Sequence, residues 1–363
     1  MTQLTRQFTL RFSAPAFLGN AHQSAQWRTP PIKALLRQCW RMAWAAEHGF
    51  KDDWQAMREE EGRLFGHAWL KTDRDTDGKE VAGRKSRVRL RLGHWEQGKL
   101  GTWQGLEEAR VKHPEAEKAQ YKVGPHAYLG FGPLDAKGGT QLAKIGENIR
   151  IAIQPGEHAR FALAFPADAA PLIDAALRLM HAWGTLGGRS RNGWGSFTLT
   201  GEDETSRALL AAPALATTDW QTALQLDWPH AVGHDTRGAL VWQTAPHADW
   251  RALMKTLAEI KIALRTQFRF TTGKGASQPE ERHWLSYPVT NHSVQGWGNL
   301  RLPNTLRFKL RPHGDGGQLV GVIFHMPCQP PGAFRPDVRT LANVWQQVHR
   351  HLDATASLTR IPA

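Results

Sequence analysis

Two periodicities alternate along this chain, and their alternation restricts the fold more than any other feature. Residues 7–12 change between polar and apolar at every step, which is the two-residue period of a half-buried strand. Residues 29–43 and 170–183 place apolar side chains three and four positions apart, which is the period of a helix with one buried face. Thr29 followed by two prolines is a typical helix start. The pattern predicts an α+β fold.

The second half of the chain repeats this order in part. An acidic and then alanine-rich stretch at residues 201–218 separates the halves. We therefore predict an N-terminal domain over residues 1–205, with an insertion around 66–127, and a C-terminal domain over residues 217–363. In the second half we expect strands at 224–228 and 239–243, a helix at 250–265, a hairpin of 306–310 with 319–325, and a final helix at 338–352.

The composition favours a polyanionic partner. The 363 residues include 46 Lys and Arg against 33 Asp and Glu, a formal net charge of +13. Hydrophobic residues make up 41%, which argues against disorder. Cys39 and Cys328 are far apart and lack CxxC partners, so we expect no disulfide framework and no metal site. No apolar run has the length of a membrane span, and no signal core is present; we expect a cytoplasmic protein with no cofactor.

A glycine-rich segment between residues 186 and 197 is the strongest functional signal. Glycines permit a concave nest of backbone N–H groups that suits an anion, and arginine forks match phosphate oxygens. A tryptophan here either stacks on a base or packs in the core. The segment is not a Walker loop, because no Lys-Ser/Thr pair ends it, and a plain connection is the alternative. Its candidate residues are Gly187, Gly188, Arg189, Ser190, Arg191, Asn192, Gly193 and Trp194.

Two further segments are basic. Lys33, Arg37 and Arg41 recur on one face of the first predicted helix with no acidic residue before Glu47, although a solvated face is the alternative. Residues 84–92 alternate Val and Leu with Arg, which predicts a strand with one cationic face.

Several motifs, in their order along the chain, resemble the RAMP superfamily of CRISPR proteins, and within it the first subunits of type III-B Cmr effector complexes. They are Ala16 to Gly19, Arg28 to Arg37, Trp40-Arg41, Leu64 to Gly66, Tyr128 to Gly132, Gly187 to Phe197, Leu285 to Pro288 and Leu302 to Leu306. The resemblance implies two tandem RRM-like ferredoxin-fold domains with a glycine-rich loop. It also implies a non-catalytic subunit that caps the 3′ end of a guide RNA and helps to capture single-stranded target RNA beside other RAMP subunits.

The candidate RNA-binding residues follow from these features together. The resemblance places the basic ridge of the first predicted helix (Lys33, Arg37 and Arg41) on phosphates and the glycine-rich loop on the RNA backbone. Basic residues of the cationic strand and of the long polar loop at 271–304 complete the set. In addition to the loop residues, it comprises Arg28, Lys33, Arg37, Arg41, Arg84, Lys85, Arg87, Lys274, Arg282 and Arg301.

Catalysis is the main alternative. RAMP subunits that cut target RNA carry an aspartate between the first strand and the first helix, whereas residues 13–37 contain no Asp or Glu to hold a hard cation. His22 in that segment leaves open a metal-independent RAMP endoribonuclease. A scaffold that contacts mainly protein is a third possibility, and a DNA reader is disfavoured because no helix-turn-helix or zinc-finger pattern is present.

Overall fold

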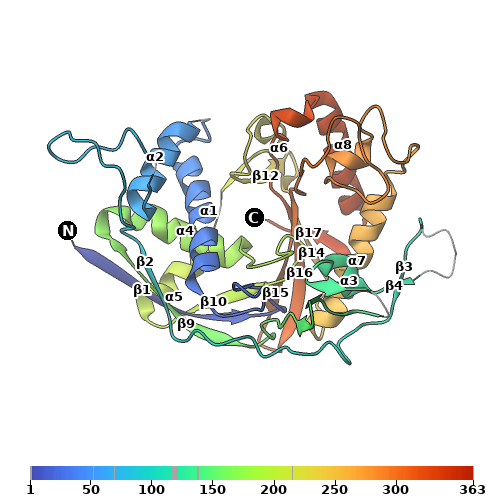
Figure 1. Cartoon of the computed structure of the whole chain (residues 1–363), viewed down its shortest axis with the longest axis horizontal. Coiled ribbons are helices and arrows are strands. Elements are labelled where there is room, and N and C mark those ends of the chain that lie inside the picture. Colours follow the sequence, from blue (N-terminus) through green and yellow to red (C-terminus); the bar gives the residue numbers. More distant parts are fainter. Residues whose placement is uncertain are drawn as a thin grey trace. The chain divides into compact units, whose positions relative to one another are not determined.

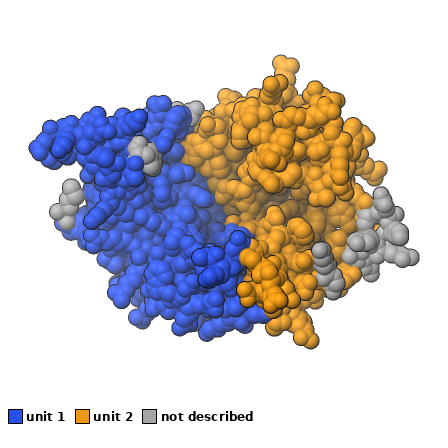
Figure 2. Space-filling model, in the orientation of Figure 1, with its two compact units in different colours: residues 1–101, 151–188, 195–216 blue, residues 102–150, 189–194, 217–363 orange. Residues whose placement is uncertain are grey.

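The computed structural model describes residues 2–51, 53–68, 70–115, 122–136, 139–214 and 216–362 (Figure 1). The expected mixed α+β character is confirmed. The chain forms two compact units, coloured separately in Figure 2. Unit 1 comprises residues 1–101, 151–188 and 195–216, and unit 2 comprises residues 102–150, 189–194 and 217–363.

Unit 1 is built on a four-stranded antiparallel sheet. Its strands are β1 (Gln3–Phe12), β2 (Arg89–Leu92), β9 (His158–Pro166) and β10 (Phe197–Gly201), in the spatial order β10-β1-β9-β2. Helix α1 (Thr29–Glu47) follows the first strand, and α4 (Ala170–Trp183) follows the third. The connectivity is therefore β-α-β-β-α-β, with the fourth strand beside the first.

The core of unit 1 lies between this sheet and the two helices, which cover one face of it (Figure 1). Phe8, Leu10 and Phe12 of β1 are fully or almost fully buried, as are Ile32 and Leu36 of α1. Two further helices, α2 (Trp54–Phe65) and α5 (Glu204–Ala211), complete the unit, together with a short 3₁₀ turn at Ala167–Ala169.

Unit 2 repeats this connectivity with a second antiparallel sheet. Its strands are β14 (Val241–Thr244), β15 (Leu306–His313), β16 (Gln318–His325) and β17 (Leu358–Arg360), in the order β15-β16-β14-β17. Helix α7 (Trp250–Thr266) follows the first of these strands, and α8 (Val338–Ala354) follows the third. Counted within the unit, the fourth strand again lies beside the first.

Both long helices of unit 2 begin at an aspartate. Asp249 accepts hydrogen bonds from the N–H groups of Arg251 and Ala252, and Asp337 accepts one from Thr340. Such caps satisfy amides that have no partner within the helix.

A histidine pair joins α8 to β16 in the core. Nε2 of His349 is 2.9 Å from Nδ1 of His325, whose ring stacks on Trp345 at 4.0 Å between centroids. His325 is fully buried and His349 is almost so.

Short elements make up the rest of unit 2. They are β3 (Val111–Lys112), β4 (Lys122–Val123), α3 (Pro125–Gly130), β5 (Leu134–Asp135), β6 (Gln141–Leu142), β7 (Lys144–Ile145), β8 (Asn148–Ile149), β11 (Thr217–Asp219), α6 (Trp220–Ala223), β12 (Val232–Asp235), β13 (Gly238–Ala239), and 3₁₀ turns at Glu281–Trp284 and Gly332–Phe334. Within the described ranges, no helix combines the length and the apolar character that crossing a membrane requires.

Several local expectations change. The strand expected at 224–228 is wrong: the chain there turns after α6, which Asp219 caps by accepting a hydrogen bond from the Thr222 N–H at 2.8 Å. The hairpin and the final helix are confirmed as β15–β16 and α8. The last change from unit 1 to unit 2, after residue 216, falls in the predicted boundary region, but unit 2 also takes in residues 102–150 and 189–194.

Candidate nucleic-acid interface

Glycines in the glycine-rich loop allow close backbone packing. Gly187 and Gly195 have φ values of +93° and +65°, where other residues are strained. A Cβ on Gly195 would lie 1.8 Å from the carbonyl oxygen of Leu186, and one on Gly187 would lie 2.6 Å from that of Phe17. These glycines are required by the fold of unit 1 itself.

Much of the loop backbone is already hydrogen-bonded within the protein. The N–H groups of Gly188 and Gly195 donate to the carbonyl oxygens of Phe17 and Pro15, and those of Asn192 and Gly193 donate to Arg189 and Ser190. These four amides cannot also form an anion nest. An anion nest that uses these four amides is therefore excluded, and the loop's binding of phosphate stays a prediction.

The tip of the loop, residues 189–194, packs within unit 2. The carbonyl oxygen of Arg191 accepts the N–H of Phe308 at 3.0 Å, so the tip pairs with β15, an edge strand of the unit 2 sheet. Asn192 donates from Nδ2 to the carbonyl oxygen of Leu129 at 2.7 Å and accepts from the Lys261 ammonium at 2.5 Å. Asn192 is thus a structural link rather than a free polar group.

Trp194 lies in the core of unit 2, which corrects its proposed stacking on a base. None of its surface is exposed. Its ring meets those of Trp103, His126 and Trp250 edge-on, at centroid distances of 5.9, 6.2 and 6.2 Å. Of the two roles open from the sequence, burial is the one that this residue has.

An exposed aromatic side chain lies beside the loop tip. Phe131, which follows α3, is 62% exposed. Arg189, with φ of +56°, donates from Nε to the carbonyl oxygen of Phe131 at 2.5 Å, and Arg150 donates to that of Gly132 at 3.0 Å. Two guanidinium groups are therefore held at the backbone of residues 131 and 132, next to an exposed aromatic residue. We call Phe131, Arg150 and Arg189 the Phe131 platform.

Further positive charge lies next to the loop tip, where the Lys261 ammonium donates to Asn192. Burial, with Arg265 and Arg189 nearby, lowers the pKa of Lys261 to about 7. Burial also lowers the pKa of Arg191, which lies on the exposed side of the loop tip. Burial is the main cause of both shifts, and a nearby negative charge would favour the charged form of Lys261.

The basic ridge of α1 is partly neutralised. Glu61 of α2, only 3% exposed, accepts from Arg37 at 2.9 Å and from Arg41 at 2.8 Å. The ammonium of Lys33 donates to Ser86 Oγ at 2.8 Å, and burial, followed by the charge of Arg37, lowers its pKa. Arg28 at the start of α1 donates to the carbonyl oxygen of Gly19 at 2.7 Å. The ridge has no acidic partner within its own helix, but α2 supplies one.

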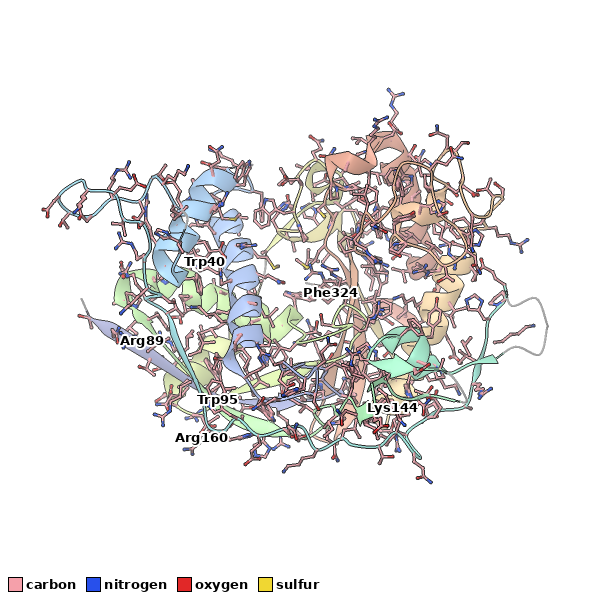
Figure 3. The ribbon with its side chains drawn as sticks, in the orientation of Figure 1. Trp40, Arg89, Trp95, Lys144, Arg160 and Phe324 are labelled. Carbon is pink, nitrogen blue, oxygen red and sulfur yellow. The ribbon has the colours of Figure 1, made fainter. Side chains whose placement is uncertain are left out.

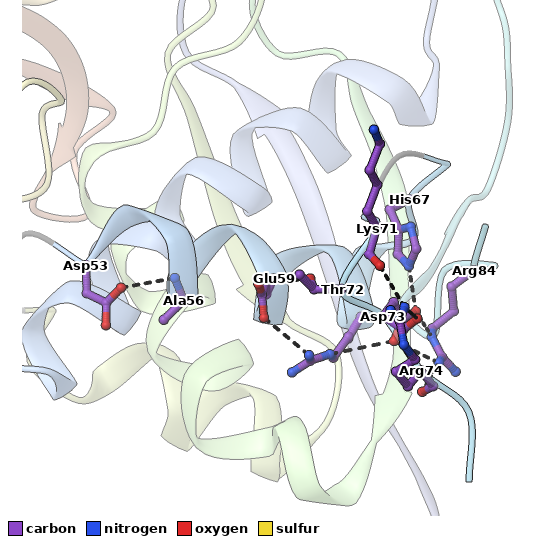
Figure 4. A network of polar contacts seen from close by, with 10 residues as sticks. Asp53, Ala56, Glu59, His67, Lys71, Thr72, Asp73, Arg74 and Arg84 are labelled. Carbon is purple, nitrogen blue, oxygen red and sulfur yellow. Dashed lines mark hydrogen bonds and ion pairs between the residues drawn. The ribbon is translucent and has the colours of Figure 1, made fainter. Parts of the chain in front are cut away.

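Arg84 is also engaged inside the protein. It forms a two-pronged ion pair with Asp73, at 2.8 and 3.0 Å, and His67 Nε2 lies 2.7 Å from the same carboxylate (Figure 4). Hydrogen bonds from Arg84 hold the pKa of Asp73 well below its usual range. The pairing with Asp73 gives Arg84 a structural role, and its phosphate role stays a prediction; Lys85 is exposed and Arg87 pairs with Asp168 at 3.1 Å.

The three candidate RNA-binding residues in the long loop of unit 2 also divide into exposed side chains and one that is engaged inside the protein. Lys274 and Arg301 are exposed. Arg282 is 5% exposed, forms an ion pair with Glu115 and lies over the Phe270 ring at 5.2 Å from its centroid. A phosphate role for Arg282 is corrected on this ground.

His22 is exposed in the segment before α1, and its own N–H donates to Asn20 Oδ1 at 2.9 Å. In the part of the chain that the structure describes, no ring nitrogen of His22 is hydrogen-bonded, and no group of three or more His, Cys, Asp and Glu side chains is placed to hold a metal ion.

Sequence analysis missed Phe131, Arg150 and Lys261. Phe131 belongs to one of the motifs that carry the RAMP resemblance, so attention to an aromatic residue flanked by glycines would have found it. Arg150 and Lys261 carry no local signal, because only the tertiary structure brings them to the loop tip.

No family model matches this chain, and no curated protein matches it. Among solved structures, it is similar to Cmr1 from Pyrococcus furiosus in its apo form, with 16% identity, 98% of each chain covered and a TM-score of 0.48. It is also similar to a chain of the type III-B Cmr-beta complex bound to cognate target RNA and AMPPnP in the presence of ssDNA, with 10% identity, 96% of this chain and 99% of the other covered, and a TM-score of 0.48.

Proposed function

We propose that this protein is a non-catalytic RNA-binding subunit of a type III CRISPR effector complex, and that it holds single-stranded RNA at the Phe131 platform. The observation that carries the proposal is an aromatic ring, 62% exposed, with Arg189 and Arg150 hydrogen-bonded to the backbone around it. Stacking on an aromatic ring and arginine contacts to phosphate are how proteins hold single strands with little sequence preference.

The twofold β-α-β-β-α-β connectivity supports the assignment to the RAMP superfamily. Both sheets place the fourth strand beside the first, as two tandem ferredoxin-like domains would. Together with the sequence motifs, this supports a subunit that caps the 3′ end of the guide RNA and helps to capture target RNA beside other RAMP subunits.

The test is a titration of labelled oligouridylate at several salt concentrations, with intact and cut RNA resolved in each sample. Binding should weaken steeply with salt while the RNA stays intact. Arg189→Ala with Arg191→Ala should lower the slope of log affinity against log salt by about 1.4, at about 0.7 for each phosphate contact to a single strand.

Phe131→Ala tests the stacking contribution separately. It should weaken binding by about 1–3 kcal/mol, while Phe131→Trp should retain it. Ile149→Ala is the matched control, because Ile149 is another exposed apolar side chain of unit 2 at 45% exposure. Unchanged binding in both the Phe131→Ala and the double-arginine variants would reject the platform, and cut RNA that depends on His22 would move the assignment to an endoribonuclease.

A further inference from the structure

The sheet of unit 1 has a second face, turned away from α1 and α4, whose residues were not among the candidates. Side chains alternate between the faces of a strand, so the residues between the buried Phe8, Leu10 and Phe12 lie on this side. We call it the open face. Its members are Thr5, Gln7, Thr9 and Arg11 of β1, Arg89 and Arg91 of β2, His158, Arg160, Ala162 and Ala164 of β9, and Thr198 and Thr200 of β10.

The open face is positively charged. The four strands contain no Asp or Glu, and each of the face's four arginines is exposed. Among the described residues, the guanidinium groups of Arg89 and Arg91 have no hydrogen-bond or ion-pair partner. The Arg160 side chain is 81% exposed and is 3.7 Å from Glu202, while Arg11 donates to the carbonyl oxygen of Gly156. Arg87, by contrast, was predicted from the sequence to bind RNA, and it forms an ion pair with Asp168.

The spacing of these arginines suits an extended chain of phosphates. Arg89 and Arg91 are two residues apart on β2, or about 6.6 Å along the strand. Their partners on β9 are Ala164 and Ala162, and Gly93 lies beside Arg160, where its N–H donates to the Arg160 carbonyl oxygen at 2.9 Å. Small neighbours leave each guanidinium free to reach outward.

An exposed tryptophan follows the arginine-bearing strand β2 in the chain. Trp95 follows β2 closely in the chain and is 55% exposed, and its carbonyl oxygen accepts from Gln26 Nε2 at 2.9 Å. Figure 3 labels it together with Arg89 and Arg160 along this side of unit 1. An aromatic ring beside a row of arginines favours a nucleic-acid strand over an acidic protein, because bases stack on the ring while phosphates pair with the guanidinium groups.

We infer that the open face is a second RNA-binding surface, on which Arg89, Arg91 and Arg160 hold successive phosphates of a single strand and Trp95 stacks on one of its bases. The nature of the ligand rests on the proposed function. The surface itself consists of different residues from the Phe131 platform and is tested separately.

The experiment uses the full chain and labelled oligouridylate across a salt series. The triple variant Arg89→Ala/Arg91→Ala/Arg160→Ala should lower the salt slope by about 2, at about 0.7 per lost contact. Lys79→Ala/Arg339→Ala/Arg350→Ala removes the same charge from exposed positions outside either surface and is the control. Trp95→Ala should weaken binding by about tenfold. The triple Arg→Lys variant should keep most of the slope.

The outcomes separate this inference from the proposed function. If the triple alanine variant matches the control while the Phe131 platform variants lose binding, the open face is rejected and the proposed function stands. If the triple variant loses binding and the platform variants do not, the Phe131 platform is rejected and the open face is the RNA-binding surface. Competition by poly-glutamate as strong as that by unlabelled oligouridylate would reject the open face as a nucleic-acid surface. A protein that binds no RNA under any condition would overturn both.

Discussion

The two units share one connectivity and use the second face of their sheets in opposite ways. In the third strand of unit 1, Arg160 points away from the helices with its side chain 81% exposed. In the third strand of unit 2, Phe324 also lies on the face opposite the helices, and it is 1% exposed with Val320 and Val322 buried beside it. Figure 3 labels both residues. The same strand order therefore sets where the core between helices and sheet lies, while the residues at alternate positions decide whether the other face is buried or exposed.

The connection from the last helix to the last strand also differs between the units. In unit 2, only Thr355 to Ser357 separate α8 from β17. Between α4 and β10 of unit 1 the connection is longer, residues 184–196, and its middle part with Arg189 and Arg191 belongs to unit 2. An insertion at one equivalent connection thus supplies the charged groups that its counterpart lacks.

The largest effect should come from truncating the buried face of unit 2. Phe324→Ala should lower the free energy of unfolding by about 3–5 kcal/mol, because it leaves a cavity in a fully packed position. Arg160→Ala, at the exposed face of the matching strand in unit 1, should change it by less than about 0.5 kcal/mol. Chemical denaturation monitored by circular dichroism measures both. Equal losses in the two variants would remove the distinction between the two faces.

A somewhat smaller loss in the free energy of unfolding is expected from a substitution in the glycine-rich connection of unit 1. Gly195→Ala combines a positive φ with a Cβ 1.8 Å from the Leu186 carbonyl oxygen, and should cost at least about 2 kcal/mol. Ser357→Ala in the short connection of unit 2 is exposed and serves as the control. Thermal melting of the two variants measures the difference. A Gly195→Ala protein as stable as the control would show that the loop geometry is not constrained.

Mild acid should affect unit 2 before unit 1. Burial lowers the pKa of His349 to about 3, and that of His325 well below its usual value. Both pKa values are lower in the folded chain than in the unfolded chain, so the stability present above about pH 6.5 is lost as the pH falls toward 3. Between pH 6.5 and 5, His349 alone accounts for about 2 kcal/mol.

In unit 1, Asp73 has a pKa held low by Arg84, so its contribution is lost only below about pH 4. Hydrogen exchange at pH 7 and pH 5, corrected for intrinsic rates, should show protection falling first in β16 and α8. His349→Gln should reduce this pH dependence. Equal loss of protection in β1 and β16 would contradict the expectation.

Periodicity predicted the regular elements well, because the buried face of a helix or strand is written in its own residues. The helix around Ile32 and Leu36, the hairpin around Phe308 and the final helix all form as expected. The strand expected at 224–228 failed, because a short apolar run does not distinguish a strand from a turn that buries Leu224.

The site was harder to predict, because charge in a sequence does not reveal its partner. Glu61, far along the chain, neutralises Arg37 and Arg41, and Asp73 holds Arg84. The alternation at residues 84–92 correctly indicated a cationic face, but only the structure distinguishes Arg87, which is paired, from Arg89 and Arg91, which have no partner among the residues that the structure describes.

The pairing of the loop tip with β15 has a consequence for how the protein is made. Phe308, whose N–H donates to the Arg191 carbonyl oxygen, is synthesised long after the loop itself. A ribosome therefore releases Arg189 and Arg191 well before the strand that fixes their backbone exists. Nascent chains that stop before β15 carry these arginines without the strand that holds the backbone of the tip, so the tip takes its final conformation only once β15 has emerged.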